Sequence, residues 1–396
     1  MSASPRDGNG KDPLRSTLTC IALLWLAGNG LRMTILAVPP VIPMMHDDLH
    51  MSQTAVGIIA GLPAVLFACA AVPGSLLIAR FGALPTLIIG LVATGLGSAL
   101  RGAAYGMPVL YAATVITAFG VAVMQPSLPP LVRAWLPDRV GFGTAVYTNG
   151  LLVGELVPVA LMVPMVLPLV GGSWRLGFVV WGIPCVVIAL VILALAPQAQ
   201  STTVISPGPR RWWPDWHKGL IWRLGLMLGS VNAMYFATNG FIPDYLHQTG
   251  RSEIISPALT ALNFGQLPAS AILLVFVGRW VRQVWPYFAC GVLCLASFVG
   301  ILVGNGWVIV ASAGVLGFAA AAILIFMLAL PPLLSPADDI HRMTAGMFTI
   351  SYSCAVIVPV ISGVLWDMTG IAASAFVPIA LCTLLLMGFA PSVRPK

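Results

Sequence analysis

The stretch QVWPYFACGVLCLASFVGILVGNGWVIVASAGVLGFAAAAILIFMLALPPLLSPA, from Gln283 to Ala337, decides the fold class because it contains no Asp, Glu, Lys or Arg. A helix needs about 20 apolar residues to cross the hydrocarbon core of a bilayer. The stretch is therefore too long for one span and long enough for two. Asn305 and Gly306, near its middle, mark the expected break between two membrane helices.

The whole chain has the same apolar character. Of its 396 residues, 59% are hydrophobic and 8% are charged, whereas roughly 25% of the residues in a typical soluble protein are charged. This small number of charged residues cannot cover the surface of a folded protein of this size in water. Lipid must therefore be the main solvent around the folded chain. The composition excludes an ordinary soluble protein and a disordered chain, and it predicts an integral membrane protein.

Dividing the charge-poor stretches at Gly, Pro and Asn predicts an all-α protein with twelve transmembrane helices. The expected spans are residues 17–42, 53–78, 84–104, 108–131, 142–168, 175–196, 220–245, 255–278, 284–304, 307–331, 343–365 and 370–390.

The Lys and Arg residues are distributed unequally between the loops of the two sides. Assigning the loops to alternate sides gives one side only Arg101, Arg175 and Arg251. The other side receives fourteen basic residues: Arg6, Lys11, Arg15, Arg80, Arg133, Arg139, Arg210, Arg211, Lys218, Arg279, Arg282, Arg342, Arg394 and Lys396. Because cytoplasmic loops are enriched in Lys and Arg, we expect both termini in the cytoplasm.

The longest hydrophilic stretch divides the chain into two halves of six spans. We expect a cytoplasmic tail (1–16), an N-terminal six-helix bundle (17–196), a cytoplasmic linker (197–219), a C-terminal six-helix bundle (220–390) and a second tail (391–396).

An internal repeat supports this division, because similar short motifs recur about 200 residues apart in the same order. The pairs are Val41-Ile42-Pro43 with Ile242-Pro243, Leu62-Pro63-Ala64 with Leu267-Pro268-Ala269, Leu128-Pro129-Pro130-Leu131 with Leu330-Pro331-Pro332-Leu333, and Arg139 and Gly143 with Arg342 and Gly346. Two parallel repeats predict pseudo-symmetric bundles with a cavity between them, gated by alternating access.

Arg32 is the strongest candidate for a functional residue, because it lies deep in the first expected span. A cation at that depth costs roughly 2.5–3.5 kcal/mol on insertion scales, so we expect it to face the protein interior or a watery cavity. One interpretation is a bidentate anchor for a small planar anion or a strongly dipolar group. The other is a structural Arg that pairs with an internal carboxylate or with helix carbonyls.

Glu155 is the only carboxylate well inside the expected spans. It is a candidate for pairing with Arg32, for carrying a coupling proton, or for a structural role near one membrane face. Other polar side chains inside the spans are candidates either for the substrate site or for contacts between helices. They are Asn29, Gln125, Tyr147, Asn232, Tyr235, Asn239, Asn263, Gln266 and Tyr352. In the repeat, Asn232 takes the place that Arg32 has in the first half.

The chain carries no enzyme signature, and we predict neither an enzyme nor a cofactor. It lacks a phosphate-binding glycine loop and a HExxH motif, and its His and Cys residues have no metal-ligand spacing, so no metal site is expected. The basic residues form no stripe, which argues against nucleic acid. The expected partners are the lipid bilayer, a small-molecule substrate, and a co-transported proton or exchanged ion, with the chain as a monomer.

The twelve spans, the central linker and the repeat resemble the major facilitator superfamily, and Arg80-Phe81-Gly82 resembles the end of its signature loop. Within it, the chain is similar to the cyanate/2-nitroimidazole permease subfamily over most of its length. The motifs that carry this resemblance are Leu31-Arg32, Ala37-Val38-Pro39-Pro40-Val41-Ile42-Pro43, Asp48-Leu49, Leu62-Pro63, Leu100-Arg101, Leu128-Pro129, Pro137-Asp138-Arg139-Val140-Gly141-Phe142, Trp174-Arg175, Tyr352, Pro359, Gly363, Asp367 and Gly370.

The resemblance implies a secondary active transporter, or permease, for a small polar or anionic solute of cyanate-like or nitro-aromatic character. A multidrug exporter of the same fold is the alternative, and it would have a large apolar cavity. A membrane sensor or assembly protein that transports nothing is the alternative of a different class.

Overall fold

The computed structural model describes residues 13–50, 53–197 and 211–393. Within these ranges the secondary structure is helical and no strand is present. Twelve helical segments are long and apolar enough to cross a membrane, and each coincides with one of the expected spans. The prediction of an all-α membrane protein with twelve spans is confirmed.

The first half of the chain forms six spans, several of which are interrupted. Its elements are α1 (Pro13–Gly30), α2 (Met33–Leu36), η1 (Pro39–Val41), α3 (Ile42–Leu49), α4 (Gln53–Phe81), α5 (Ala83–Arg101), α6 (Met107–Met124), η2 (Gln125–Ser127), α7 (Leu128–Trp135), η3 (Pro137–Arg139), α8 (Val140–Leu161), the π-helical turn η4 (Met162–Val166), α9 (Leu167–Leu169) and α10 (Trp174–Leu195).

The second half repeats this arrangement. Its elements are α11 (Gly219–Gln248), η5 (Ser252–Ile254), α12 (Ile255–Phe264), α13 (Gln266–Trp280), α14 (Trp285–Val303), α15 (Trp307–Ala329), α16 (Pro331–Leu334), η6 (Ala337–Asp339), α17 (Ile340–Thr369), η7 (Ala372–Ala375), α18 (Phe376–Phe389) and η8 (Ala390–Val393).

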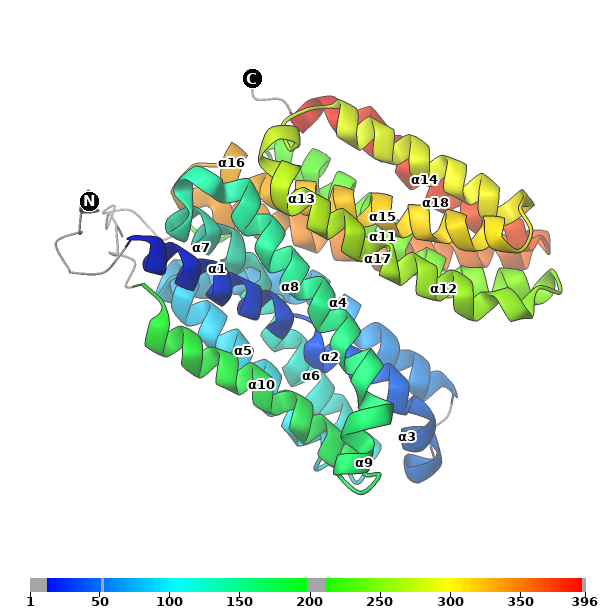
Figure 1. Cartoon of the computed structure of the whole chain (residues 1–396), viewed down its shortest axis with the longest axis horizontal. Coiled ribbons are helices and arrows are strands. Elements are labelled where there is room, and N and C mark those ends of the chain that lie inside the picture. The colour runs from blue at the N-terminus through cyan, green and yellow to red at the C-terminus, as the bar shows by residue number, and fades with distance from the viewer. Residues whose placement is uncertain (1–12, 51–52, 198–210, 394–396) are drawn as a thin grey trace, which may run out of the picture.

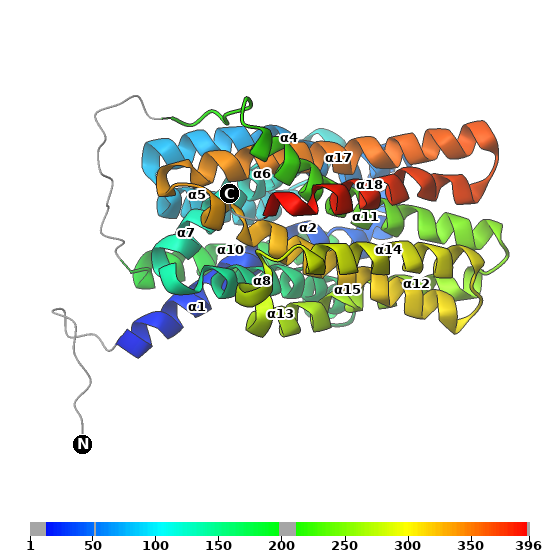
Figure 2. The same cartoon turned by 90° about the horizontal axis from the view of Figure 1, so that it is seen from above.

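The two halves form two helix bundles that lie side by side (Figure 1). Across the interface α4 packs against α17, and α8 packs against α13 and α15. Figure 2 shows α4 and α17 together along one side of the molecule. The helix α1 begins at the same end of the bundles as α7 and α16, and α3, α9 and α12 lie toward the other end (Figure 1). We call the first of these the α7–α16 end.

The repeat motif Leu-Pro-Pro-Leu begins a short helix in each half. Pro129 and Pro130 lie in the first turn of α7, and Pro331 and Pro332 lie in the first turn of α16. Proline suits a first helical turn because the N–H groups there have no partner within the helix. The two short helices therefore occupy equivalent places in the two bundles.

The bundles are joined at the α7–α16 end by a charged side chain. Arg133 of α7 donates two hydrogen bonds from Nη1, to the carbonyl oxygens of Pro332 (2.9 Å) and Ser335 (2.5 Å). Nearby, Gly141 of α8 lies against the backbone of Gly278 of α13. Small residues and a guanidinium thus hold the two halves together at this end.

The break expected at Asn305-Gly306 is present. α14 ends at Val303 and α15 begins at Trp307, and Gly306 has a φ of +50°. Residues with a Cβ rarely adopt a positive φ, so glycine permits the turn that separates the two spans. The uncharged stretch from Gln283 to Ala337 therefore forms two helices.

The first span is broken where it carries Arg32. α1 ends at Gly30, and Arg32 is the residue immediately before α2, with φ −127° and ψ −23°. Farther along, Pro39 and Pro40 lack the N–H groups that would continue α-helical hydrogen bonding. Arg32 thus lies on an irregular segment between two helices rather than on a continuous helix face.

Candidate functional site

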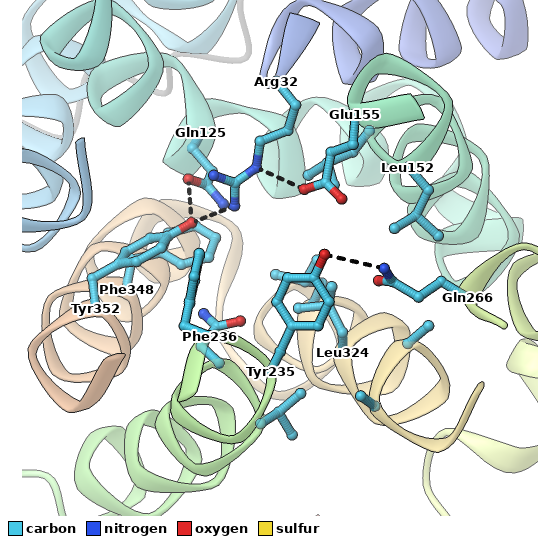
Figure 3. A pocket seen from close by; sticks show the side chains of 16 residues that line it. Arg32, Gln125, Leu152, Glu155, Tyr235, Phe236, Gln266, Leu324, Phe348 and Tyr352 are labelled. Atoms are coloured by element: carbon cyan, nitrogen blue, oxygen red, sulfur yellow. Dashed lines mark hydrogen bonds and ion pairs between the residues drawn. The ribbon is translucent and has the colours of Figure 1, made fainter. Parts of the chain in front are cut away.

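A cavity is lined by side chains of both bundles (Figure 3). Its volume is about 30 Å³, counted as the space open to the centre of a water molecule, which is enough for about two or three water-sized groups. The first bundle contributes Arg32, Gln125, Leu151, Leu152 and Glu155 to its wall. The second bundle contributes Val231, Asn232, Tyr235, Phe236, Gln266, Ala320, Ala321, Leu324, Leu328, Phe348 and Tyr352.

Arg32 is bonded across the interface to Tyr352. Arg32 Nη2 donates to the hydroxyl oxygen of Tyr352 over 3.0 Å. This hydroxyl in turn donates to Oε1 of Gln125, in the turn after α6, over 3.1 Å. Tyr352 therefore uses both functions of its hydroxyl, accepting from a cation and donating to an amide.

Glu155 lies on the other side of the same guanidinium. Its Oε1 is 3.4 Å from Arg32 Nε, and the side chains are 11% exposed for Arg32 and 19% for Glu155. Nε is nevertheless buried without a hydrogen-bond partner among the described residues. The two charges attract each other, but an N–H group of the guanidinium is left unsatisfied next to the cavity.

Aromatic rings surround the charged group. The guanidinium carbon of Arg32 is 5.3 Å from the ring centroid of Phe67, on α4. The Phe67 ring is in turn 5.0 Å from the Tyr352 ring, and Phe348 contacts Tyr352 at 6.1 Å. Aromatic faces attract a guanidinium and exclude water from it, which strengthens its attraction for an anion.

The opposite wall carries a network of neutral polar side chains from α11, α12 and α13. The Tyr235 hydroxyl donates to Oδ1 of Asn263 over 2.6 Å and accepts from Nε2 of Gln266 over 3.3 Å. Asn263 donates to Oδ1 of Asn239 over 3.1 Å. Tyr235 and Gln266 face the cavity (Figure 3), and Asn263 and Asn239 support Tyr235 through hydrogen bonds.

Asn232 lines the cavity and also holds two helices of the second bundle together. Its Nδ2 donates to Oγ of Ser351 on α17 over 2.7 Å. It is 8% exposed, so the amide lies at the edge of the cavity with one of its groups already paired.

Asn29 and Tyr147 do not line the cavity. Asn29 is buried against α8, and its Nδ2 donates to the carbonyl oxygen of Trp25 over 3.0 Å. A Cβ on Gly154 of α8 would lie 2.8 Å from the Asn29 Cα, so only glycine permits this approach. Tyr147 is buried at the same contact between α1 and α8, where its carbonyl faces Gly28.

Several wall residues were missing from the sequence prediction of the site. Phe348 and the leucine and alanine residues of the wall carry no signal that separates them from core or lipid-facing residues, and the same holds for Phe67 next to Arg32. In a membrane protein both faces of a helix are apolar, so hydrophobic periodicity does not identify the side that faces a cavity.

The arrangement suits recognition of a small planar anion or dipole. It offers guanidinium N–H groups on one wall, a phenol and an amide on the other, and aromatic rings around them. No group of three or more potential metal ligands is found in the part of the chain that the structure describes.

Comparison with known proteins agrees with the fold. The family model described as the Major Facilitator Superfamily matches residues 24–306. The chain belongs to the Major Facilitator Superfamily. It is therefore a transporter of the permease type and not an enzyme, and its twelve spans make it a multi-pass membrane protein.

Two superfamily relatives match the chain over nearly its full length. The cyanate transport protein CynX of Escherichia coli (strain K12) is 23% identical, over 95% of this chain and 98% of its own. The 2-nitroimidazole transporter of the same organism is 22% identical, over 95% of both chains. These relatives confirm the resemblance to the cyanate/2-nitroimidazole permeases.

A solved superfamily structure confirms the architecture. The transporter FucP in its outward conformation superimposes with a TM-score of 0.72 at 17% identity, over 96% of this chain and 100% of that chain. At this identity the similarity concerns the fold alone, which is the two-bundle arrangement predicted from the repeat.

Proposed function

We propose that the protein is a secondary active transporter that moves a small planar anion or strongly dipolar solute by alternating access, with Arg32 as the substrate anchor. The observation that carries the proposal is the buried Arg32 guanidinium at a cavity between the bundles. Its Nε lies 3.4 Å from Oε1 of Glu155 but makes no hydrogen bond within the described ranges. An unsatisfied buried donor costs about 1–3 kcal/mol. A ligand oxygen or nitrogen that accepts from it would recover this free energy.

The relatives support a substrate of this chemical class. They are named as transporters of cyanate and of 2-nitroimidazole. Cyanate is a compact linear anion whose terminal atoms accept hydrogen bonds from a guanidinium, and a nitro group is a planar dipole whose two oxygens fit the bidentate geometry of a guanidinium. The small volume of the cavity favours such solutes over the bulky compounds of a multidrug exporter.

We assign the remaining polar residues by their distance from the cavity. Gln125, Asn232, Tyr235, Gln266 and Tyr352 complete the binding site together with Arg32. Asn239 and Asn263 act by orienting Tyr235. Asn29 and Tyr147, which are buried between α1 and α8, act by holding the first span in place rather than by touching the solute.

Glu155 is the proposed coupling group. Its carboxylate lies next to the Arg32 guanidinium, which is also the group that we propose binds the anion. A negatively charged Glu155 and a bound anion therefore compete for Arg32. Protonation of Glu155 removes the competing charge and links anion binding to proton binding. Tyr235, Tyr352 and Arg32 are the other titratable groups around this position. The exchange of one anion for another is the rival coupling mode.

We infer the orientation from the basic loops. The tails 1–16 and 391–396 and the linker 197–219 then lie in the cytoplasm, and the six-helix bundles 17–196 and 220–390 lie in the membrane. We propose that this membrane is a bacterial inner membrane and that the chain is a monomer. The basic residues Arg133, Arg139, Arg282 and Arg342 lie at or near the ends of spans, on the side that this orientation assigns to the cytoplasm. Cysteine labelling of loop residues from each side of the membrane tests it.

Uptake of radiolabelled cyanate and 2-nitroimidazole by cells that express the protein tests the function. We expect Arg32→Ala to abolish cyanate uptake while the amount of folded protein in the membrane stays normal. Arg32→Lys restores the charge but not the planar guanidinium group, so we expect it to recover only part of the uptake. Arg251→Ala is the control, because Arg251 is an arginine of the second bundle that does not line the cavity and donates to the carbonyl oxygen of Gly304 over 2.7 Å. Unchanged cyanate uptake by Arg32→Ala would refute the anchor.

Glu155→Gln separates the coupling modes. The amide mimics the protonated acid, so we expect anion binding to persist while accumulation driven by a pH gradient is lost. Gradient-driven accumulation that matches the unmodified protein would exclude Glu155 as the coupling group. Thermal stabilisation by hydrophobic cations instead of small anions would favour the exporter.

A further inference from the structure

Arg101, the last residue of α5, is a second buried guanidinium, and it lies outside the cavity. Its side chain is 1% exposed. None of the ion pairs among the described residues involves it. A membrane protein that keeps an unpaired cation in its interior bears a considerable cost, which calls for a specific role.

The partners of Arg101 come from three other spans of the same bundle. Its Nη1 donates to the carbonyl oxygen of Thr34 over 2.9 Å, and its Nε donates to Oγ1 of Thr114 on α6 over 3.2 Å. Its guanidinium carbon is 5.7 Å from the ring centroid of Phe178 on α10. Arg101 thus ties the first span to three of its neighbours.

The carbonyl of Thr34 accepts from Arg101 because the first span is irregular at this point. In a continuous helix the N–H of Val38 would donate to Thr34, four residues earlier. Here it donates to Ile35 instead, over 3.3 Å. Pro39 and Pro40 follow and have no N–H groups to offer. Arg101 supplies the hydrogen bond that the broken helix lacks.

We propose that Arg101 is a positioning residue for Arg32. Thr34 is two residues after Arg32, in the short helix α2 that Arg32 precedes. By holding the Thr34 carbonyl, Arg101 fixes the start of α2 and with it the direction in which Arg32 points into the cavity. The inference rests on the proposed anchoring function of Arg32 for its consequence in transport.

A second clamp holds the far end of the same segment. Arg175 of α10 pairs with Asp48 of α3, and its Nε donates to the carbonyl oxygen of Ala104 over 3.0 Å. Trp174 also donates to Asp48, over 3.1 Å. This clamp remains when Arg101 is replaced, so we expect the bundle to fold without Arg101 and only the start of α2 to lose its fixed position.

The first test measures the position of residue 32 without any substrate. Arg32→Cys is introduced into a chain whose seven native cysteines are replaced, and its modification by a water-soluble thiosulfonate is timed. We expect Arg101→Met to change the modification rate roughly tenfold, the equivalent of one hydrogen bond from a charged donor. Arg251→Met, which removes the bond to Gly304, leaves the rate unchanged. Equal rates with and without Arg101 overturn the proposal.

The second test uses cyanate transport in the chain with Arg32 intact. We expect Arg101→Met to raise the KM for cyanate roughly tenfold with little change in kcat. Arg101→Lys is expected still to donate to the Thr34 carbonyl, so its KM should return most of the way to that of the unmodified protein. A purely structural role would instead lower the amount of folded protein and leave KM unchanged.

Two further outcomes are informative. If Arg101→Met does not reach the membrane, Thr114→Val and Phe178→Leu, which remove the two other groups that hold the Arg101 guanidinium, are assayed in its place. A KM equal to that of the unmodified protein in both variants overturns the proposal. If Arg32→Ala still transports cyanate, the proposed anchor fails. The modification rate at residue 32 then still decides whether Arg101 positions this segment.

Discussion

Replacement of Arg133 by Met is expected to open the α7–α16 end of the transporter. Arg133 of α7 donates to the carbonyl of Pro332 in α16 and to that of Ser335, the residue that follows α16. A hydrogen bond that involves a charged group contributes about 1.5–3 kcal/mol. Both bonds come from one partly buried nitrogen, so we expect a combined loss of about 2–3 kcal/mol.

A loss of this size shifts the equilibrium between closed and open arrangements of this end by about 30- to 150-fold. Spin labels at Ala134 and Ala337, two exposed positions next to α7 and α16, report the separation of the bundles by double electron–electron resonance. We expect a longer distance to become the major population in Arg133→Met.

Arg282→Met is the matched control for this experiment. Arg282 donates to the carbonyl oxygen of Leu333 over 3.0 Å, so it makes the same kind of bond to the same short helix. Arg282 and Leu333 both belong to the second bundle, so the loss of this bond leaves the interface between the bundles intact. A distance distribution unchanged in Arg133→Met, or one shifted equally in Arg282→Met, would refute the reasoning.

Three further predictions concern other parts of the structure. Gly154→Val should prevent α1 from packing on α8, because a side chain there meets the backbone of Asn29. The variant should be degraded, or should aggregate in detergent size-exclusion chromatography, and a normal elution profile would contradict this. Gly306→Ala should cost about 1–3 kcal/mol, since its φ of +50° and ψ of −122° are rarely adopted by residues with a Cβ, and should lower the melting temperature without affecting KM. Tyr235→Phe leaves Asn263 and Gln266 without their hydroxyl partner, so cyanate uptake should fall roughly tenfold at unchanged expression, and full activity would remove Tyr235 from the site.

The fold was predictable because lipid imposes simple rules on sequence. The number of spans follows from stretches of about 20 residues that lack charge. The break at Asn305-Gly306 follows from a residue that tolerates positive φ. The paired bundles follow from prolines that recur in the same order, such as those that begin α7 and α16.

The details of the site were less accessible, because they depend on where helices end. Asn29 and Arg32 are one turn apart, so a continuous helix would place them on the same face. α1 ends at Gly30, and this break separates the two side chains, leaving Asn29 against α8. Similarly, the sequence gives no depth for Glu155 relative to Arg32, and their distance of 3.4 Å depends on how α8 packs against the broken first span.

The two walls of the cavity differ in charge, although the sequence predicts that the two halves are repeats. In that predicted repeat Asn232 takes the place of Arg32, and both residues line the cavity. An assembly of two identical halves would present either two guanidinium groups or none to the solute. Joining unlike halves in one polypeptide gives a single cationic centre, and with Arg32 as the proposed anchor this predicts one anion for each transport cycle.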